Sequence, residues 1–423
     1  MIDPRVQRRL RLLVLSSDTF PPTRVDVSVL FGEELAGRGH QIDWILQSEA
    51  DCKRAYVARW GGGQVWVAPS NHRRSLIGRL MKHAAGIRND ARIFSLLRGD
   101  RYDAVEVKDK FIAGLFAVLA ARLYRKRFVY WLSFPLPEFY LSKARDGLAP
   151  YPLLYRIRGH AFGFLLYRIL LRAADHVFVQ SEQMRRDIAA YGIPASKLTA
   201  VPMGIRMDSR NCALARAAPR SRIPAGETAF VYLGTLGRER RIDFLLRVLA
   251  RVRAEIPQIK LYLVGKGEEP QDEEFLLQEA RRIGVLASVV FVGQLPQPEA
   301  LRYVQDADVC VSPFYPTPIL NSTSPTKLVE YMSLGKAVVA NTHPEQQLLI
   351  EESGCGYCVP YEEQAFSDAI VKLVRAPERA LAMGERGRRY VLEHRAYSRI
   401  ADRVERELLE IVAAAQPAAG AHP

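Results

Sequence analysis

Short apolar runs alternate with segments of helical periodicity along almost the whole chain, and this alternation constrains the fold more than any other feature. Strands that are separated by helices pair in parallel, so the alternation predicts parallel sheets with helices on both faces. The pattern stops over residues 206–226, which are rich in Arg, Ala and Pro, and then restarts. The sequence therefore predicts an α/β protein of two Rossmann-like domains. The predicted strands are Leu10–Ser16, Gln41–Leu46, Val65–Ala68, Ala104–Val107, Phe128–Leu132, His176–Gln180, Phe230–Leu233, Lys260–Val264, Val289–Val292, Val309–Ser312, Ala337–Ala340 and Gly356–Val359.

The length of 423 residues supports the same division, because a chain of this size is too long for one compact core. We expect an N-terminal domain over 1–205, a linker over 206–226 and a C-terminal domain over 227–395. A bracing helix over 396–413 and a disordered tail over 414–423 complete the expected organisation. Two such domains hold a ligand at the carboxyl ends of their strands, in a cleft across which the sheets face each other.

The positive charge is confined to the first half of the chain. The formal net charge is +14, and residues 1–200 hold 32 Lys and Arg against 18 Asp and Glu, so the whole excess lies there. Such an asymmetry indicates an anionic partner for the first half, which is a phosphate, a membrane surface or a nucleic acid. A solvated surface, in a protein from an Arg-rich proteome, is the alternative.

The sequence predicts no membrane-spanning helix, because no run of 18 or more apolar residues occurs. The longest apolar run, Phe111–Leu123, is too short and is predicted to be a buried helix. The N-terminus is charged and then apolar without a small-residue cleavage site, so we expect no signal peptide and a cytoplasmic location. Tyr151–Arg172 intersperses arginines with Leu, Phe, Ile and Tyr, which favours peripheral contact with an anionic membrane at its inner face. A packed helix with snorkelling arginines is the alternative.

Two motifs have the spacing of redox or metal sites but are interpreted as structural. Cys355-Gly-Tyr-Cys358 has the CxxC spacing without a second Cys or His pair, so its thiols are expected to pack around a short strand. Asp306-Ala-Asp308 has the DxD spacing of a metal motif, but it falls where a predicted helix ends. We expect neither a metal site nor a cofactor.

A first anion-binding element follows the strand that ends near Leu233. Gly234 and Thr235 form a turn in which backbone N–H groups can approach a phosphate, and the helix that follows adds its positive N-terminal dipole. Arg238, Arg240 and Arg241 supply charge-assisted hydrogen bonds to diphosphate oxygens. A solvated helix start is the alternative for this motif taken alone.

A second anion-binding element reads loop, helix, glycine stop and strand. Ser324 is expected to be the N-cap and Pro325 the first helical residue, and the free N–H groups of the turn through Thr326 form an anion site. Lys327 adds positive charge on the same turn. Glu330 lies about one turn further on and is expected to accept hydrogen bonds from a ribose diol; a surface charge is the alternative.

The stretch Ser324-Pro-Thr-Lys-Leu-Val-Glu-Tyr-Met-Ser-Leu-Gly-Lys-Ala-Val-Val-Ala340 resembles the donor-site signature of the retaining family-4 (group 1) glycosyltransferases of the GT-B fold, in the subset that reads Ser-Pro-x-Lys-Leu-x-Glu-Tyr-Met. The resemblance extends over roughly residues 10–395. It implies that the C-terminal domain holds a nucleotide-sugar donor and the N-terminal domain an acceptor. The supporting stretches are Asp18-Thr-Phe-Pro-Pro22, Ala36-Gly-Arg-Gly-His40, Ser181-Glu-Gln-Met184, Val201-Pro-Met-Gly204, Leu263-Val-Gly265-Lys-Gly-Glu268, whose Gly265 is counted with the donor site, and Phe291-Val-Gly293.

Three positions depart from the pattern of that family. Ser322 stands where the first of two glutamates is common, so the usual acidic contact with the sugar ring is missing. Thr23 and Arg24 stand near the position of a Gly-Gly pair, and Arg24 is expected to contact phosphate instead. Thr235 replaces the Arg or Lys that usually follows Gly234, which leaves the arginines further along to bind the diphosphate.

The chemistry follows from where charge develops. Breaking a sugar–phosphate bond places negative charge on the diphosphate, which Arg240, Lys327 and helix N-termini are expected to stabilise without a metal. The resemblance implies retention by same-face attack, in which a donor phosphate oxygen takes the acceptor proton and no protein nucleophile is needed. Ser133 and Glu138 follow a strand and are the acceptor-side candidates, with Glu138 as a general base or orienting group. A solvated loop carboxylate is the alternative for Glu138.

These features predict a glycosyltransferase that moves a sugar from a nucleotide diphosphate-sugar to an acceptor hydroxyl, in surface polysaccharide or glycolipid synthesis. The alternatives are a transferase with a soluble acceptor and a nucleotide-sugar epimerase of the same fold. A nucleic-acid binder would also use the basic first half, but the donor-site stretch weighs against it, so we expect no nucleic-acid partner.

Overall fold

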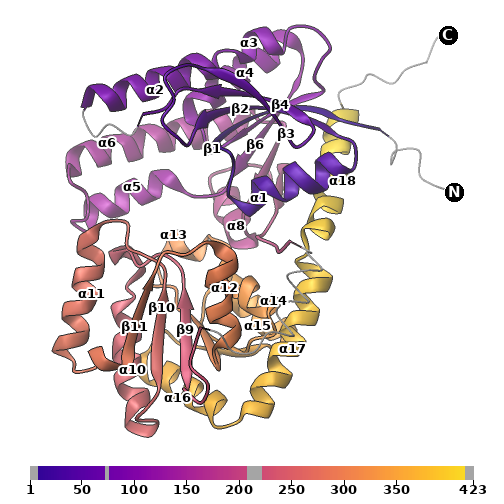
Figure 1. Cartoon of the computed structure of the whole chain (residues 1–423). Coiled ribbons are helices and arrows are strands. Elements are labelled where there is room, and N and C mark those ends of the chain that lie inside the picture. The colour runs from indigo at the N-terminus through magenta and orange to yellow at the C-terminus, as the bar shows by residue number, and fades with distance from the viewer. Residues whose placement is uncertain (1–7, 72–75, 207–221, 415–423) are drawn as a thin grey trace, which may run out of the picture. The chain divides into compact units, whose positions relative to one another are not determined.

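The computed structural model describes residues 8–71, 76–206 and 222–414, and the chain divides into two compact units (Figure 1). Unit 1 comprises Met1–Pro202 and Tyr397–Pro423, and unit 2 comprises Met203–Ala396. Most of the predicted linker and nearly all of the predicted tail lie outside the described residues. Each unit is a doubly wound α/β layer structure, which confirms the predicted pair of Rossmann-like domains.

Unit 1 contains an eight-stranded sheet in the order β3-β4-β2-β1-β5-β6-β7-β8, in which every neighbouring pair is parallel except β3 and β4. Helices cover both faces, so alternate residues of one strand enter different cores. In β1, Leu12 and Val14 face one core and Leu13 and Leu15 the other. The strands are β1 (Arg11–Phe20), β2 (Gln41–Ser48), β3 (Tyr56–Trp60), β4 (Gly63–Ala68), β5 (Ala104–Lys108), β6 (Arg127–Leu132), β7 (His176–Val179) and β8 (Leu198–Ala200).

The hairpin of β3 and β4 was not predicted. Gly61 and Gly62 both have positive φ, at 55° and 76°, and form the two-residue turn that joins antiparallel strands with the correct twist. The search for alternating strands and helices missed β3 because no helix separates it from β4.

The helices of unit 1 follow the apolar periodicity with two differences. The segment between β4 and β5 forms two helices rather than one. In addition, α4 is not buried on all sides: Ile112, Leu119 and Leu123 are exposed, so the prediction of a buried helix is wrong for that face. The helices are α1 (Val25–Ser28), α2 (Leu76–Asp90), α3 (Ile93–Leu96), α4 (Phe111–Tyr124), α5 (Leu136–Arg145), α6 (Pro152–Gly163), α7 (Leu171–Ala173), α8 (Glu182–Ala190) and α18 (Tyr397–Ala413), with π-helical turns at Leu30–Leu35 and Phe164–Leu170 and a 3₁₀ turn at Ala195–Lys197.

The last helix, α18, packs on the sheet of unit 1. Its apolar side chains share a core with β1 and β2, and its acidic face meets the residues before β2. His40 accepts a hydrogen bond from the N–H of Leu10 through Nδ1 (3.0 Å), and its Nε2 lies 2.7 Å from Glu405. Arg38 pairs with the same carboxylate at 2.7 Å, so His40 and Arg38 together attach α18 to the rest of unit 1.

Unit 2 contains six parallel strands in the order β11-β10-β9-β12-β13-β14, so the order of the strands reverses between β9 and β12. In open α/β sheets, ligands bind beyond the carboxyl ends of the strands at such a reversal. The strands are β9 (Ala229–Leu233), β10 (Lys260–Val264), β11 (Val289–Gly293), β12 (Val309–Ser312), β13 (Val338–Asn341) and β14 (Gly356–Val359). The helices are α10 (Asp243–Glu255), α11 (Pro270–Arg282), α12 (Gln297–Asp306), α13 (Pro318–Asn321), α14 (Thr326–Ser333), α15 (Pro344–Ser353), α16 (Glu363–Val374) and α17 (Pro377–His394), with 3₁₀ turns at Arg238–Arg240 and Leu286–Ser288.

Among the described residues, no helix has the length and apolar content needed to cross a membrane.

Candidate active site

The donor-side site of unit 2 begins with two glycines that follow β9 and β10. Gly234 and Gly265 have φ values of 145° and 146°, which side chains rarely adopt. A Cβ atom on Gly265 would lie 2.0 Å from the carbonyl oxygen of Gly234, so the two loops approach each other at a distance that only glycine permits. The N–H of Gly234 donates to the carbonyl of Val264 (2.9 Å), which fixes this approach at the carboxyl edge of the sheet.

The three arginines predicted to bind diphosphate have different surroundings. Arg238 lies over the ring of Phe275, 4.9 Å from its centroid, and Arg241 lies over the ring of Tyr315 at 5.4 Å. Arg240 forms no ion pair with the described residues, and its charge acts on Lys327, whose pKa it helps to lower. Of the three arginines, Arg240 is thus the one whose charge acts on Lys327, whereas the other two lie over aromatic rings.

Lys327 extends from the first turn of α14 toward β9. Its Nζ donates to the hydroxyl of Tyr232 (3.0 Å) and lies over the rings of Tyr232 and Phe314, at 4.2 and 4.9 Å from their centroids. Burial and then the charge of Arg240 hold the pKa of Lys327 well below its usual range, while Glu330 opposes this change. Burial also raises the pKa of Tyr232 to about 12. The two cations therefore repel each other, and no described carboxylate forms an ion pair with either.

The start of α14 differs from the prediction by one residue. Pro325 is the N-cap, and Ser324 caps nothing: its Oγ accepts a hydrogen bond from the N–H of Met203 (3.0 Å), so the prediction of Ser324 as N-cap is wrong. This hydrogen bond is a tertiary contact, because Met203 and Ser324 are far apart in sequence. Thr326 begins the helix, half-buried, and its N–H bonds the carbonyl of Ser324.

Glu330 is half-buried on the same helix and already has a partner. The amide of Gln297 donates to its carboxylate at 2.6 Å. Burial raises the pKa of Glu330, although the hydrogen bond from Gln297 and the charge of Lys327 act in the opposite direction. The next residue, Tyr331, accepts the N–H of Leu233 on its hydroxyl (2.8 Å) and so ties α14 to the end of β9.

Sequence reasoning missed four members of this site. Tyr232 was counted as a strand residue, and Phe314, Gln297 and Tyr331 were not assigned a role. Their contacts join segments that are distant in sequence, and only the reversal of strand order between β9 and β12 indicates that the loops meet there.

The DxD and CxxC residues, which are interpreted as structural from the sequence, have the following surroundings. The carboxylate of Asp306 accepts the N–H groups of Arg222 (2.7 Å) and Ile223 (3.3 Å), and Asp308 accepts that of Ala229 (2.8 Å). Burial raises the pKa of the Cys355 thiol to about 11.

Unit 1 carries a second charged cluster at the carboxyl ends of β1, β5 and β6. Arg24 donates to the carboxylate of Asp26 (2.9 Å) and to the hydroxyl of Ser133 (3.3 Å). Lys108 is buried and lies 2.9 Å from Asp26, and Asp109 accepts both the N–H and the hydroxyl of Ser133.

The acidic residues of this cluster raise the pKa of Arg24 and so stabilise its positive charge. Burial alone would lower the pKa of Arg24, but Asp26, Asp18 and Asp109 together raise it above its usual range. Burial raises the pKa of Asp109. Arg24 was expected to contact phosphate, whereas these carboxylates surround it. The sequence had singled out Arg24 and Ser133 but not Asp26, Lys108 or Asp109.

Glu138 is helical rather than part of a loop. It lies in the first turn of α5, half-buried, and accepts the hydroxyls of Tyr167 (2.7 Å) and Tyr191 (3.1 Å) on Oε1. The two tyrosine rings stack with centroids 3.9 Å apart. Its Oε2 is buried without a hydrogen-bond partner among the described residues. The prediction of a loop position is therefore wrong, and so is the alternative of a solvated carboxylate, because two aromatic hydroxyls donate to one oxygen of Glu138.

Two doubly wound α/β units, each with charged side chains beyond the carboxyl ends of its strands, define the GT-B class of folds. Residues 29–204 match the family model described as glycosyl transferase 4-like domain, and residues 227–376 match that of the glycosyl transferases group 1. Together the matches span about three quarters of the chain. The chain belongs to the group 1 glycosyltransferases, enzymes that transfer sugars.

Individual proteins are similar at low identity. The alpha-monoglucosyldiacylglycerol synthase of Streptococcus pneumoniae is 24% identical over 65% of this chain, and the match spans only 60% of that relative. The GDP-mannose-dependent alpha-(1-6)-phosphatidylinositol monomannoside mannosyltransferase of Mycobacterium tuberculosis is 24% identical over 90% of this chain and 93% of its own length. Among solved structures, the sucrose-phosphate synthase of Thermosynechococcus elongatus has a TM-score of 0.73 and 21% identity, covering 96% of this chain and 100% of that one.

Proposed function

We propose that the chain transfers a sugar from a nucleotide diphosphate-sugar, bound by unit 2, to an acceptor hydroxyl. This proposal rests on one observation: the side chains of Arg240 and Lys327 lie near each other, beside the loops of Gly234 and Gly265. Two neighbouring cations without a described carboxylate partner, next to backbone that a ligand can approach closely, are suited to a diphosphate. A relative that depends on GDP-mannose supports a donor of this class.

The reaction then uses charge rather than a protein nucleophile. The bond between the anomeric carbon and the diphosphate oxygen breaks, and its electron pair stays on the diphosphate. Arg240 and Lys327 stabilise that developing charge, which is the role a metal ion has in other enzymes, so we propose that no metal or other cofactor takes part. The acceptor oxygen bonds to the anomeric carbon from the same face, its proton passes to a donor phosphate oxygen, and the configuration is retained.

Glu330 is proposed to bind the ribose of the donor. Its carboxylate accepts one hydrogen bond, from the exposed Gln297, and its raised pKa reflects burial that hydroxyl donors would compensate. A ribose diol supplies two such donors. This agrees with the proposed membership of the subfamily that reads Ser-Pro-x-Lys-Leu-x-Glu-Tyr-Met.

The acceptor is proposed to be a lipid-linked or saccharide hydroxyl presented to the Arg24–Ser133 cluster of unit 1, for surface polysaccharide or glycolipid synthesis. The names of two relatives contain a glycolipid, monoglucosyldiacylglycerol in one and phosphatidylinositol monomannoside in the other, which supports this choice. Asp109 contacts Ser133 and has a raised pKa, so it joins Glu138 as a candidate for orienting the acceptor hydroxyl.

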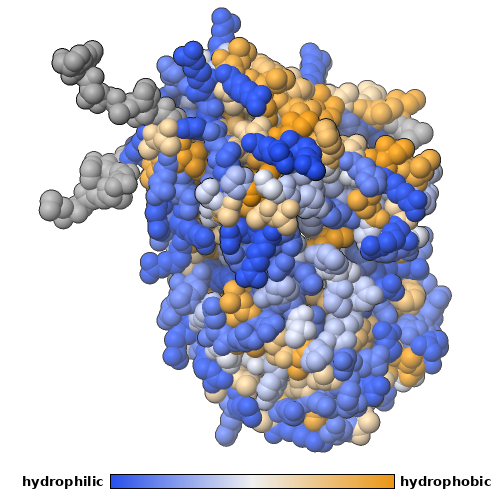
Figure 2. All heavy atoms as spheres, turned by 180° about the vertical axis from the view of Figure 1, so that it is seen from behind, coloured by the Kyte–Doolittle hydropathy of each residue, from blue (hydrophilic) through white to orange (hydrophobic). Residues whose placement is uncertain are grey.

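Peripheral contact with an anionic membrane is part of the same proposal. Most exposed large hydrophobic side chains among the described residues lie on unit 1, and Figure 2 shows hydrophobic patches beside hydrophilic side chains. The start of α6 exposes Leu153 (72%) and Ile157 (57%), and Arg156 and Arg158 lie directly before and after Ile157 in sequence. Such a mixture of apolar and basic side chains favours an anionic membrane surface. A transferase with a soluble acceptor would not float with vesicles.

The test of the donor site compares three substitutions in the intact chain. Thermal stabilisation by UDP-, GDP-, ADP- and dTDP-sugars identifies the donor, and its affinity is then measured for K327M, R240Q and R241Q. We expect K327M and R240Q to weaken binding by about tenfold or more, because each removes a charge-assisted hydrogen bond. R241Q is the matched control, because the guanidinium of Arg241 lies over the ring of Tyr315 and is expected not to contact the donor. Equal losses in all three variants, or no stabilisation by any nucleotide-sugar, would refute the proposal.

A further inference from the structure

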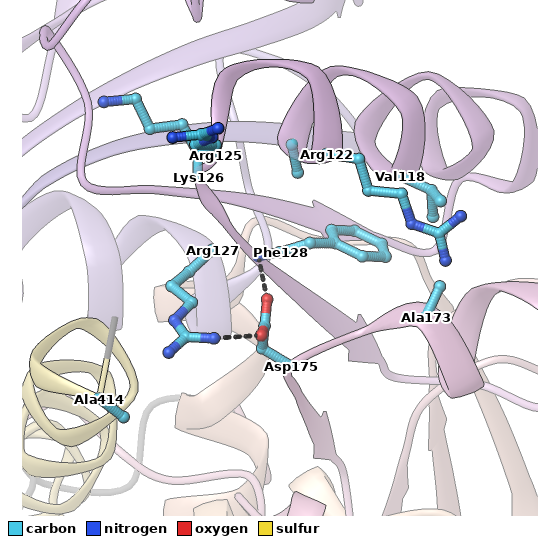
Figure 3. A pocket seen from close by; sticks show the side chains of 10 residues that line it. Val118, Arg122, Arg125, Lys126, Arg127, Phe128, Ala173, Asp175 and Ala414 are labelled. Atoms are coloured by element: carbon cyan, nitrogen blue, oxygen red, sulfur yellow. Dashed lines mark hydrogen bonds and ion pairs between the residues drawn. The ribbon is translucent and has the colours of Figure 1, made fainter. Parts of the chain in front are cut away.

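Unit 1 contains a basic pocket away from the carboxyl edge of its sheet. Its volume is about 430 Å³, and it lies where β6 and β7 begin (Figure 3). Ser133 follows the other end of β6, and a strand of six residues spans about 20 Å, so the pocket is separate from the acceptor-side cluster. The pocket is lined by Val118, Ala121, Arg122, Arg125, Lys126, Arg127, Phe128, Ala173, Asp175 and Ala414.

The lining carries four cations and one carboxylate. Arg127 pairs with Asp175 at 2.6 Å, and Asp175 also accepts the N–H of Phe128 at 2.8 Å, so this pair is held in place. Lys126 pairs with Asp100, which is fully exposed and therefore contributes little.

Arg122 and Arg125 are exposed and form no ion pair with the described residues. Figure 3 shows Arg122 on one side of Phe128, and Arg125 and Lys126 on the other. The pocket thus has an excess of positive charge that its own carboxylate does not compensate.

The backbone conformation of Arg125 is a second indication of a binding site. Arg125 ends α4 in the left-handed conformation, with φ of 53° and ψ of 43°, at a position where helices usually place glycine. Only two other non-glycine residues among those described have positive φ, Asp109 and Arg241, and both lie in the charged loops described above. Strained residues of this kind concentrate at binding sites.

Apolar side chains accompany the cations. Val118, Ala121, Phe128 and Ala173 supply an apolar part of the lining, and Leu119 and Leu123 are exposed on the same helix, on either side of Arg122 in sequence. A ligand with an anionic group and an adjoining apolar part would use both kinds of surface.

We propose that this pocket binds a phosphate-bearing group, at a site distinct from those for donor and acceptor. The arginines bind its oxygens through charge-assisted hydrogen bonds, and the apolar lining contacts the carbon skeleton attached to the phosphate. The group comes either from a soluble phosphate compound or from the headgroup of an anionic phospholipid.

The test uses the intact chain, the double variant R122Q/R125G and the control R88Q. Glycine is chosen at 125 because it suits the left-handed backbone, so this variant removes charge without adding strain. Arg88 is an exposed arginine of α2 outside the pocket. One arm titrates inorganic pyrophosphate by calorimetry, and the other measures flotation with phosphatidylcholine vesicles with and without phosphatidylglycerol.

We expect R122Q/R125G to weaken one of these interactions by about tenfold or more, and R88Q to change it less than twofold. Loss confined to pyrophosphate identifies a soluble phosphate, and loss confined to phosphatidylglycerol vesicles identifies a lipid headgroup. The K327M variant is titrated in parallel, so that binding of pyrophosphate at the donor site is counted separately. The proposal is overturned if both probes bind R122Q/R125G as tightly as the unaltered chain, or if R88Q has the same effect.

Discussion

Replacing Glu106 by glutamine tests how the sheet of unit 1 tolerates a buried acid. Glu106 is in the middle of β5, only 1% exposed, and neither oxygen of its carboxylate has a hydrogen-bond partner among the described residues. Burial raises the pKa of Glu106 to about 8, although the charge of Lys108 opposes this change. The folded protein therefore holds this side chain as a neutral acid near pH 7.

The size of the effect follows from the two pKa values. The ordinary pKa is 4.5 and the folded value is about 8. Each tenfold change in proton affinity is worth about 1.4 kcal/mol, so the raised pKa corresponds to about 5 kcal/mol. Because the folded state binds the proton more tightly, this stability is fully present below pH 4.5 and is lost as the pH rises to about 8. E106Q removes the titrating group and hence this dependence.

Urea unfolding followed by tryptophan fluorescence measures the effect selectively, because all four tryptophans, Trp44, Trp60, Trp66 and Trp131, belong to unit 1. Between pH 5 and pH 9, the stability of E106Q relative to the unaltered chain should rise by several kcal/mol, about the amount derived above. E49Q, which changes an exposed glutamate, should leave the pH dependence unchanged. Parallel pH profiles for E106Q and the unaltered chain would show that Glu106 is solvated or paired.

Three further outcomes are expected. Gly265→Ala should lower the free energy of unfolding by about 2 kcal/mol or more and weaken donor binding, because its Cβ would collide with the carbonyl of Gly234; calorimetry and donor titration measure both. His40→Ala should cost about 1–3 kcal/mol and loosen α18, since Leu10 N–H and Glu405 lose a partner; limited proteolysis near the C-terminus detects the loosening. Donor binding should take up a proton at pH values above the lowered pKa of Lys327, because the bound diphosphate raises that pKa; calorimetry in buffers of different ionisation enthalpy measures the uptake, which K327M should abolish.

The alternation of strands and helices was sufficient to predict most of the fold. Parallel strands that are buried on both faces are short apolar runs, and each predicted run corresponds to a strand of the structure within a few residues. The pattern failed where the chain departs from that rule. β3 is a partly exposed edge strand joined to β4 by Gly61-Gly62, and the search for intervening helices passes over such a hairpin.

The candidate site was only partly predictable, for a different reason. Lys327 and Glu330 belong to one helix, so their proximity to a common ligand is a local property that the sequence can indicate. The choice among Arg238, Arg240 and Arg241 is tertiary, because Phe275 and Tyr315 come from other segments and occupy two of the three. The sequence could not distinguish them.

Backbone conformation explains why charged residues were hardest to assign. Asp109, Arg125 and Arg241 are non-glycine residues at positive φ, where glycine would cost less. Glycine is the usual sequence signal for such a backbone conformation. Where a charged residue replaces glycine, the sequence does not indicate the turn, and the residue is interpreted as a solvent-exposed charge. The surrounding fold must hold each residue there, as the hydrogen bonds of Ser133 hold Asp109. If this conformation serves to direct the carboxylate of Asp109 to Ser133, Asp109→Gly should reduce sugar transfer although glycine suits the backbone there, and unchanged transfer would refute this role.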